Sequence, residues 1–235
     1  MKILRLFFGL LILGIFSLSV QAQSKLPVKL GLKVAPNICW MNPSTSDYSS
    51  DGIKAGAIIG FVSDFYFAER YAISTGFNFS FLNGKLRYRD ERLKPLMDTT
   101  IILMGQVNRK YNFIYLEIPI MVKMQTKQFG RFSFYGQIGF GTAFRLKATA
   151  NEEFTPDAGQ VFDQQYNITE ATTLIRESIL VGVGTEFHLD QSSRLFLGIN
   201  YSNSLNNVLT SENMKTKAKE KSMLNYLEVS LGILF

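Results

Sequence analysis

Apolar and polar residues alternate along the last stretch of the chain, residues 223–235. Because the side chains of a β-strand point alternately to opposite faces, this pattern predicts a strand with one apolar face. That face is formed by Leu227, Val229, Leu231, Ile233 and Phe235. The other face carries Glu228, Ser230 and Gly232. Such a row is poorly suited to water, but it suits a strand that turns it toward the hydrocarbon of a membrane.

The same alternation predicts seven further strands. They are expected at residues 28–35, 53–67, 71–81, 111–124, 131–147, 175–189 and 194–204. The clearest of them sets Tyr71, Ile73 and Phe77 against Ala72 and Ser74. The connections alternate between brief turns and long polar stretches, and we expect residues 83–110 and 148–173 to form long loops.

This arrangement is typical of an outer-membrane barrel, which has brief periplasmic turns and extended outer loops. We therefore predict an all-β fold for residues 23–235, an eight-stranded antiparallel up-and-down transmembrane β-barrel. An even strand number would place both termini on the periplasmic side. No charged residue falls on the predicted outward face in the central band of the strands. The alternative is a soluble eight-stranded barrel of the lipocalin kind, whose apolar face surrounds a ligand.

Residues 1–22 are predicted to be a secretory signal peptide that is absent from the mature protein. Lys2 and Arg5 give it a basic start, residues 6–20 are almost wholly apolar, and Ala22 ends a cleavage site with small residues. A membrane-anchoring helix is the alternative, but the apolar run of about 15 residues is shorter than the roughly 20 that a spanning helix needs. The expected location is the cell outer membrane.

Charge and cysteine content argue against several functions. The formal net charge of the whole chain is +6. It falls when Lys2 and Arg5 leave with the signal, so the remaining excess is too mild to indicate a nucleic-acid partner. Cys39 is the only cysteine, which excludes an internal disulfide and a thiolate zinc site. No cofactor is expected, since glycine pairs such as Gly139 and Gly141 lie within a strand and do not precede a helix.

The inward face of the predicted barrel carries charged residues that have to be accommodated. They are Lys33, Lys54, Glu117, Lys123, Arg145, Glu186 and Glu228. Burying unpaired charge is costly, and an eight-stranded barrel is only wide enough for side chains to fill it. We therefore expect these residues to pair in an ionic core that plugs the lumen and leaves no solute channel.

Pro119 lies within a predicted strand, although proline cannot donate a hydrogen bond to a sheet. Inside a bilayer, a carbonyl group that loses its donor is costly. We therefore expect a bulge or a local break in strand pairing at this residue. A structural kink and a moving lateral seam both remain open as interpretations of such a break.

Two of the predicted outer loops are basic. Their basic residues include Lys85, Arg87, Arg89, Lys215, Lys217 and Lys219. The alternating spacing in both loops suggests strand extensions with charge on one side. Contact with the anionic headgroups of outer-leaflet lipid is one hypothesis, and ordinary solvated charge is the other.

Enzymatic chemistry has little support in the sequence. His188 is the only histidine, so a two-histidine metal site is impossible and Ser/His/Asp chemistry has one possible base. Glu186 lies on the same face and is a candidate to orient His188, with Ser178 as a remote nucleophile. A lipid-modifying enzyme is therefore the least favoured interpretation, and no catalytic residue is expected.

Several stretches resemble parts of known outer-membrane proteins. The end of the chain is similar to the terminal insertion signal of bacterial barrels, which implies barrel-assembly machinery as a partner during insertion. The residues of this signal are Tyr226, Leu231, Ile233 and Phe235. Residues 115–123 resemble the signature strand of the PorT-like barrels of Bacteroidetes. Residues 30–37, 135–139 and 201–207 are similar to other landmarks of that family.

The PorT-like resemblance covers nearly all of the chain after the signal and implies a non-enzymatic outer-membrane barrel. The namesake of the family is implicated in the type IX secretion route, which exports surface proteins. We therefore expect a component of this route or an accessory to it, with outer-membrane lipid and secretion-system proteins as partners. A small ion or solute pore and a structural envelope protein are alternatives that the residues leave open.

Overall fold

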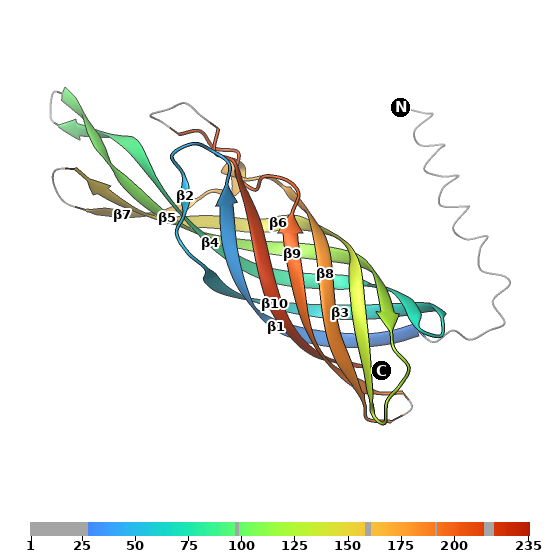
Figure 1. Cartoon of the computed structure of the whole chain (residues 1–235). Helices are drawn as coiled ribbons and strands as arrows, with labels where there is room; N and C mark the ends of the chain where they lie inside the picture. Colours follow the sequence, from blue (N-terminus) through green and yellow to red (C-terminus); the bar gives the residue numbers. More distant parts are fainter. Residues whose placement is uncertain (1–27, 97–98, 158–160, 191, 214–218) are drawn as a thin grey trace, which may run out of the picture.

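The computed structural model describes residues 28–96, 99–157, 161–190, 192–213 and 219–235. The predicted signal peptide, residues 1–22, lies outside them. Within the described part, eight long antiparallel strands form one ring, which confirms the predicted fold class (Figure 1). They are β1 (Val28–Pro43), β3 (Lys54–Ala68), β4 (Tyr71–Leu96), β5 (Thr99–Gln125), β6 (Phe132–Pro156), β8 (Ile175–His188), β9 (Arg194–Ser204) and β10 (Ser222–Leu234).

Pairing between the first and the last strand closes the ring. β1 pairs with β10 and with β3, and the pairing continues from β3 through β4, β5, β6, β8 and β9 back to β10. At the end of the chain, the backbone N–H of Phe235 donates to the carbonyl of Leu30 at 2.7 Å. A closed sheet can lie in hydrocarbon because its backbone groups find their partners in neighbouring strands.

One circuit of the ring shows how far the strands are staggered. From Ile38 the paired residues lead through Leu227, Tyr201, Val181, Ile138, Val122, Ile73 and Phe65 back to β1 at Val28. The circuit therefore starts at position 38 of β1 and returns at position 28, a stagger of ten residues. In an eight-stranded barrel, a stagger of this kind accompanies a strand tilt of about 35–45°.

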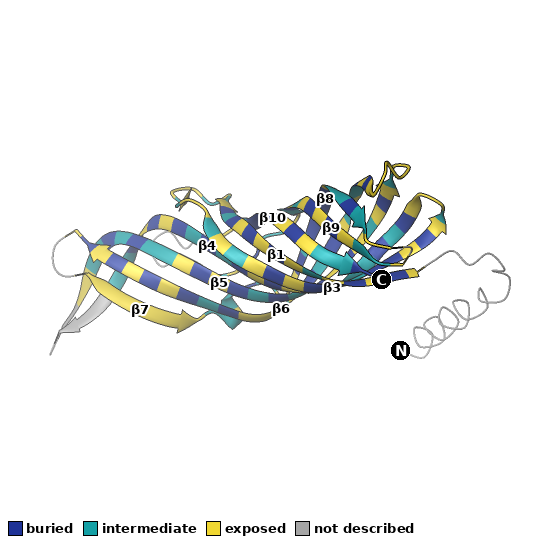
Figure 2. Ribbon diagram, turned by 90° about the horizontal axis from the view of Figure 1, so that it is seen from below, coloured by how far each residue is buried: buried dark blue, intermediate teal, exposed yellow. Residues whose placement is uncertain are grey.

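The residues on this circuit form an apolar belt around the outside of the barrel. Their side chains are exposed or half-buried, whereas inward neighbours such as Asp64, Ser74 and Lys123 are buried. Figure 2 shows the same alternation of buried and exposed residues along the strands. A lipocalin-like barrel would have the reverse arrangement, with charge outside and the apolar rows inside, so this alternative is wrong.

The outward apolar rows of β4, β5 and β6 end at one level. Phe81 pairs with Ile114, and two positions further Asn83 pairs with Asn112. On β6 the change from apolar to polar follows Leu146, where the pairing with β5 shifts register. We call this level the polar boundary. Beyond it, the outward side chains are polar or charged on β5 and β6 for as far as these two strands pair, and on β4 as far as Glu91.

Beyond the polar boundary the three strands continue, which corrects the predicted loops. β4 and β5 occupy most of residues 83–110, and β6 extends into residues 148–173. The alternating spacing of the basic residues did indicate this extension. Its inward face is buried and includes apolar residues such as Leu86, Val107 and Phe154. The polar outward face gave these residues the composition of a loop.

Shorter elements complete the part beyond the polar boundary. β2 (Ser49–Ser50) pairs with β4, β7 (Phe162–Asn167) pairs with β6, and the 3-10 helix η2 (Thr169–Ala171) follows β7. We call β2, β7, these strand extensions and the nearby connections the head. Figure 1 shows the head at one end of the barrel, with the short turns and the C-terminus at the other. The described residues include no helix with the length and apolarity that a membrane crossing requires.

The apolar belt predicts that a charge introduced on β6 lowers the free energy of unfolding by an amount that depends on its position along the strand. Ile138 lies in the middle of the outward row of β6 and is 53% exposed. Replacing Ile138 by Lys places a charge in hydrocarbon and should destabilise the folded barrel by about 2–4 kcal/mol. Denaturant unfolding in lipid vesicles measures this difference.

The control is Thr155→Lys on the same strand in the head, where the side chain is exposed to water. This change should leave the free energy of unfolding nearly unaltered. Equal effects of the two substitutions would contradict the assignment of the belt.

Candidate functional site

A compact ionic network fills the lumen near the short turns. Lys123 Nζ lies 2.6 Å from Asp64 Oδ2 and 2.6 Å from Glu186 Oε1. Arg194 Nη1 donates to Glu186 Oε2 at 2.9 Å. The side chains of Asp64 and Glu186 are fully buried, and that of Lys123 is 5% exposed. Two cations and two carboxylates therefore compensate one another, as buried charge requires.

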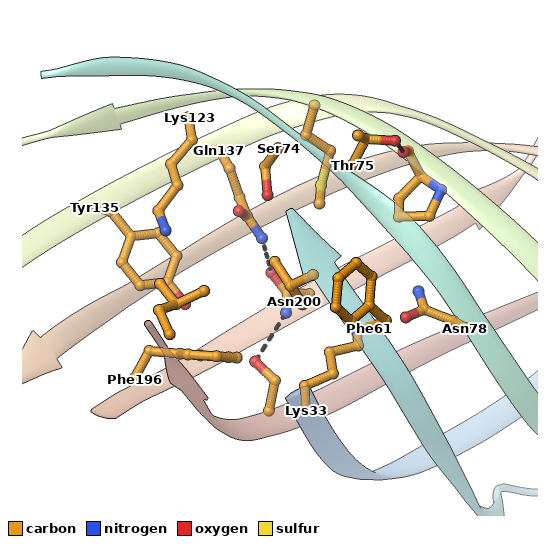
Figure 3. A pocket seen from close by; sticks show the side chains of 15 residues that line it. Lys33, Phe61, Ser74, Thr75, Asn78, Lys123, Tyr135, Gln137, Phe196 and Asn200 are labelled. Atoms are coloured by element: carbon orange, nitrogen blue, oxygen red, sulfur yellow. Dashed lines mark hydrogen bonds between the residues drawn. The ribbon is translucent and has the colours of Figure 1, made fainter. Parts of the chain in front are cut away.

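A second pair lies nearer the middle of the barrel. Lys33 Nζ donates to Glu228 Oε1 at 2.8 Å. Asn200 Nδ2 donates to the same carboxylate oxygen at 2.9 Å, and Gln137 Nε2 donates to Asn200 Oδ1 at 2.7 Å. Figure 3 shows the hydrogen bond between Gln137 and Asn200 and the Lys33 side chain below them. This layer joins β1, β6, β9 and β10 across the lumen.

The third layer separates its two charges. Glu117 is fully buried and accepts hydrogen bonds from the hydroxyl of Tyr226 at 3.0 Å and from Ser80 at 3.3 Å. Arg176, also fully buried, donates to Ser202 Oγ at 2.7 Å and lies 5.3 Å from the centre of the Tyr226 ring. In the described part of the chain, neither Glu117 nor Arg176 has an ion-pair partner. Tyr226 links them, with its hydroxyl on the carboxylate and its ring beneath the guanidinium.

The predicted cluster of seven residues is therefore distributed over several levels. Glu186 and Lys123 lie in one network, Lys33 and Glu228 in another, and Glu117 is bound to Tyr226. Lys54 is half-buried and, within the described residues, forms no ion pair or hydrogen bond with the others. The side chain of Arg145 donates to Thr172, in the connection that leads to β8.

Sequence reasoning did not include Asp64, Arg176 and Arg194 in the cluster. Asp64 falls on the inward face of its strand by simple alternation, so its membership was readable from the sequence. Arg176 and Arg194 stand at or next to the first residues of β8 and β9. The predicted strands begin at the same residues as β8 and β9, and alternation with the outward Ile175 and Leu195 places Arg176 and Arg194 inward, so their membership was also readable from the sequence.

A small cavity remains between the ionic layers (Figure 3). Its volume is about 40 Å³, and polar groups of Lys33, Asn78, Gln137 and Asn200 line it. A cavity of this size holds only a few water molecules. Larger side chains cannot be added easily, since a Cβ at Gly182 would lie 1.9 Å from Asn200 Oδ1.

Apolar groups seal the lumen on both sides of this cavity. On the side of the short turns, Tyr135, Phe196 and Leu234 form a buried cluster. On the head side, a larger cluster includes Met41, Leu82, Phe113 and Leu224. With ionic pairs between these two clusters, the described residues form a filled barrel.

Strand pairing is interrupted at Pro119 without a change of register. The ladder between β4 and β5 passes from Thr75–Ile120 to Asn78–Glu117 and omits the two pairs between them. The hydroxyl of Thr75 donates to the carbonyl of Pro119 at 2.7 Å, which supplies a hydrogen bond at the interruption. Gly76, at the omitted position, has a φ of +148°, where a Cβ would lie 1.9 Å from the carbonyl oxygen of Phe61.

A buried carboxylate holds the head together. Glu152 accepts hydrogen bonds from Arg92 and Arg109, both at 2.5 Å. Arg109 lies 5.5 Å from the ring of Tyr88, and Tyr88 stacks on Tyr48 at 4.2 Å between ring centres. Burial raises the pKa of the Tyr48 phenol, so its hydroxyl stays protonated and donates to Glu220 at 2.9 Å. These contacts join the connections after β1 and before β10 to the extended sheet.

The basic residues proposed to contact lipid headgroups are largely paired with acidic residues. Lys85 contacts Asp51, Arg87 lies 2.7 Å from the same carboxylate, and Arg89 lies 2.5 Å from Asp157. The hydrogen bond from Lys85 also holds the pKa of Asp51 below its ordinary value. The backbone of Lys219 forms an isolated β-bridge with that of Glu212, which is not an ion pair between their side chains, and Lys215 and Lys217 lie outside the described residues.

The catalytic arrangement considered from the sequence is not assembled. The Ser178 hydroxyl donates to the carbonyl of Gly141, at the far end of β8 from His188. His188 Nε2 instead lies 3.0 Å from Ser133 Oγ. Glu186 is occupied by Lys123 and Arg194. Within the described ranges, no group of three His, Cys, Asp or Glu residues is placed to hold a metal ion.

The residues of the predicted insertion signal lie on opposite faces of the last strand. Leu231, Ile233 and Phe235 belong to the outward row of the last strand, and Leu231 is 52% exposed. Tyr226 is buried in the lumen and donates to Glu117. Residues on opposite faces of a strand cannot present one surface, so Tyr226 does not share the lipid-facing row.

One protein family matches most of the sequence. A model of the family described as outer membrane protein beta-barrel domain matches residues 21–210. Neisserial surface protein A is 12% identical with a TM-score of 0.46, covering 88% of this chain and 95% of that one. The outer membrane protease OmpT of Escherichia coli is 6% identical with a TM-score of 0.45, covering 92% and 99%. OprG of Pseudomonas aeruginosa is 11% identical with a TM-score of 0.38, covering 88% and 95%. No curated protein matches.

The network around Lys123 predicts an asymmetric response to substitution. Lys123→Met leaves the carboxylates of Asp64 and Glu186 without this cation inside the barrel, and should destabilise the fold by about 3–5 kcal/mol. Adding Asp64→Asn to Lys123→Met should recover part of this loss, because the remaining charges, Glu186 and Arg194, compensate each other. Denaturant unfolding of the natural chain and the two variants in lipid vesicles measures the difference. A double variant less stable than Lys123→Met would contradict the proposed role of charge.

Proposed function

This chain belongs to the family of outer membrane protein beta-barrel domains, and from that premise we propose that it is a sealed, non-enzymatic barrel that acts through its head. The observation that carries the proposal is the contrast between its two parts. The lumen is filled by ionic and apolar layers, with a cavity of about 40 Å³ between them. The described strands of the head present an exposed polar outward face. A filled barrel anchors such a head in the membrane.

The orientation that we propose places the head outside the cell and both termini in the periplasm. Supporting it are the brief turns at one end and the long strand extensions at the other, since outer-membrane barrels have short periplasmic turns. Outer-membrane lipid then surrounds the apolar belt. The row of Leu231, Ile233 and Phe235 would be the surface that the barrel-assembly machinery reads during insertion.

The cellular process that we propose is type IX protein secretion, with the chain as a PorT-like component or accessory. The support is the resemblance of residues 115–123 and of the other landmarks to PorT-like barrels. Residues 115–123 contain Glu117 and Lys123, which take part in two layers of the lumen. Contacts with secretion-system proteins would be made by the head.

The proposed role in secretion predicts a specific effect of deleting the gene. Surface and secreted proteins that use the type IX route should decrease, while other outer-membrane proteins should be unaffected. Comparison of the surface and secreted proteomes measures this. Glu152→Ala, which removes the shared partner of Arg92 and Arg109 in the head, should restore export poorly, and Lys127→Ala in a short turn should restore it fully. An unchanged secreted proteome after deletion would remove the secretion role.

The filled lumen predicts a lack of conductance. Purified protein inserted into planar lipid bilayers should produce no stable current steps, because the apolar clusters on both sides of the cavity interrupt any water path. An open porin serves as the positive control. Regular single-channel steps from the folded protein would instead favour the small-pore alternative.

A further inference from the structure

The outward face of the head is a polar surface built from neighbouring strands. Paired residues cross it in rows, so that Arg87 lies opposite Asn108, Asn108 opposite Glu153, and Glu153 opposite Asp163. The rows on either side are rich in amides as well. The amide side chains on this face are those of Asn83, Gln106, Asn108, Asn112, Asn151, Gln165 and Asn167. Each of them is exposed or half-buried.

Within this face lies an open hollow of about 410 Å³. Asn108, Asn151 and Gln165 line it together with Lys110, and the carboxylates of Glu153 and Asp163 face each other across β6 and β7. Like charges directly opposite one another destabilise a sheet. In the described part of the chain, neither carboxylate has an ion-pair partner. The hollow therefore keeps a set of hydrogen-bond acceptors at some cost to the fold.

The chemistry of the hollow suits hydroxyl groups better than phosphate. Asn and Gln amides both donate and accept hydrogen bonds, and ionised carboxylates accept them, which matches the adjacent hydroxyls of a sugar. A phosphate would meet the negative charges of Glu153 and Asp163. Of the cations on this face, Lys85, Arg87 and Arg89 already lie against acidic residues. Lys110 lines the hollow, but its single charge is outweighed there by the two carboxylates.

The position of this face indicates the source of such a ligand. The rows begin at the polar boundary, where Asn83 and Asn112 follow the last apolar outward residues of β4 and β5. A surface that continues directly from the lipid belt lies beside the groups attached to the lipids. We propose that the outward face of the head binds uncharged saccharide, namely the sugar portion of lipid-linked glycan in the outer leaflet. This inference rests on the proposed orientation of the head outside the cell, but not on a role in secretion.

The experiment measures binding of the folded protein in detergent micelles to immobilised uncharged oligosaccharides, namely polymers of glucose, mannose, galactose and N-acetylglucosamine. The natural chain should be retained by at least one of them. The triple change Asn108→Ala, Asn151→Ala and Gln165→Ala should weaken this binding by about tenfold or more, because several hydrogen bonds are lost together. Millimolar inorganic phosphate should not displace the protein.

The control is Asn42→Ala with Gln128→Ala, which removes two amides away from the hollow and should leave binding unchanged. Heat-dependent gel mobility, a property of folded barrels, verifies that each variant has folded. The inference is overturned if the natural chain binds none of the oligosaccharides, if the triple variant binds as well as the natural chain, or if phosphate displaces it. A secretion defect after gene deletion would remain valid in each of these cases.

Discussion

The need to satisfy every backbone hydrogen bond in hydrocarbon governs this molecule. A sheet with an open edge would expose unpaired N–H and C=O groups to lipid, at a cost of several kcal/mol for each group. Closure of β1 against β10 removes that edge, and the bonds between Leu30 and Phe235 extend it to the last residue. The stagger of ten residues follows from closing eight tilted strands. Even the interruption at Pro119 is compensated, by the hydroxyl of Thr75.

Closure also explains the content of the lumen. With eight strands the interior is narrow, so inward side chains meet across it and must be compatible in both size and charge. The requirement for matching charge is visible at Lys123. Its partners Asp64 and Glu186 come from strands on either side of it around the ring. The requirement for matching size is visible at Gly182, where a single added carbon would clash with the side chain of Asn200. The lumen is therefore a core made largely of polar groups, with a structural role like that of an apolar core in a soluble protein.

Alternation was sufficient to predict the strands and the direction of their side chains, since it reports directly which face meets lipid. It was not sufficient for the partners in the lumen. Lys33 binds Glu228, whereas Glu117 binds Tyr226. Which residues meet in this way depends on the register between strands that are far apart in the sequence. The outward residues of the β4 and β5 extensions, such as Arg87 and Lys110, are polar, and a polar composition predicts a loop. Their inward neighbours in the sequence, Leu86 and Tyr111, are apolar or aromatic and so indicate a strand, but the polar composition of the whole stretch obscured that alternation.

The same difference between faces indicates where function is concentrated. In the barrel, the outward side is committed to lipid and the inward side to packing, so few positions are open to recognition. In the head, Glu152, Arg109 and the stacked tyrosines stabilise the inward side. The outward side is therefore not needed for packing. A face that keeps Glu153 opposite Asp163 is nevertheless more specific than solubility requires. Selection for contact with something outside the protein is the simplest physical reason for such a surface.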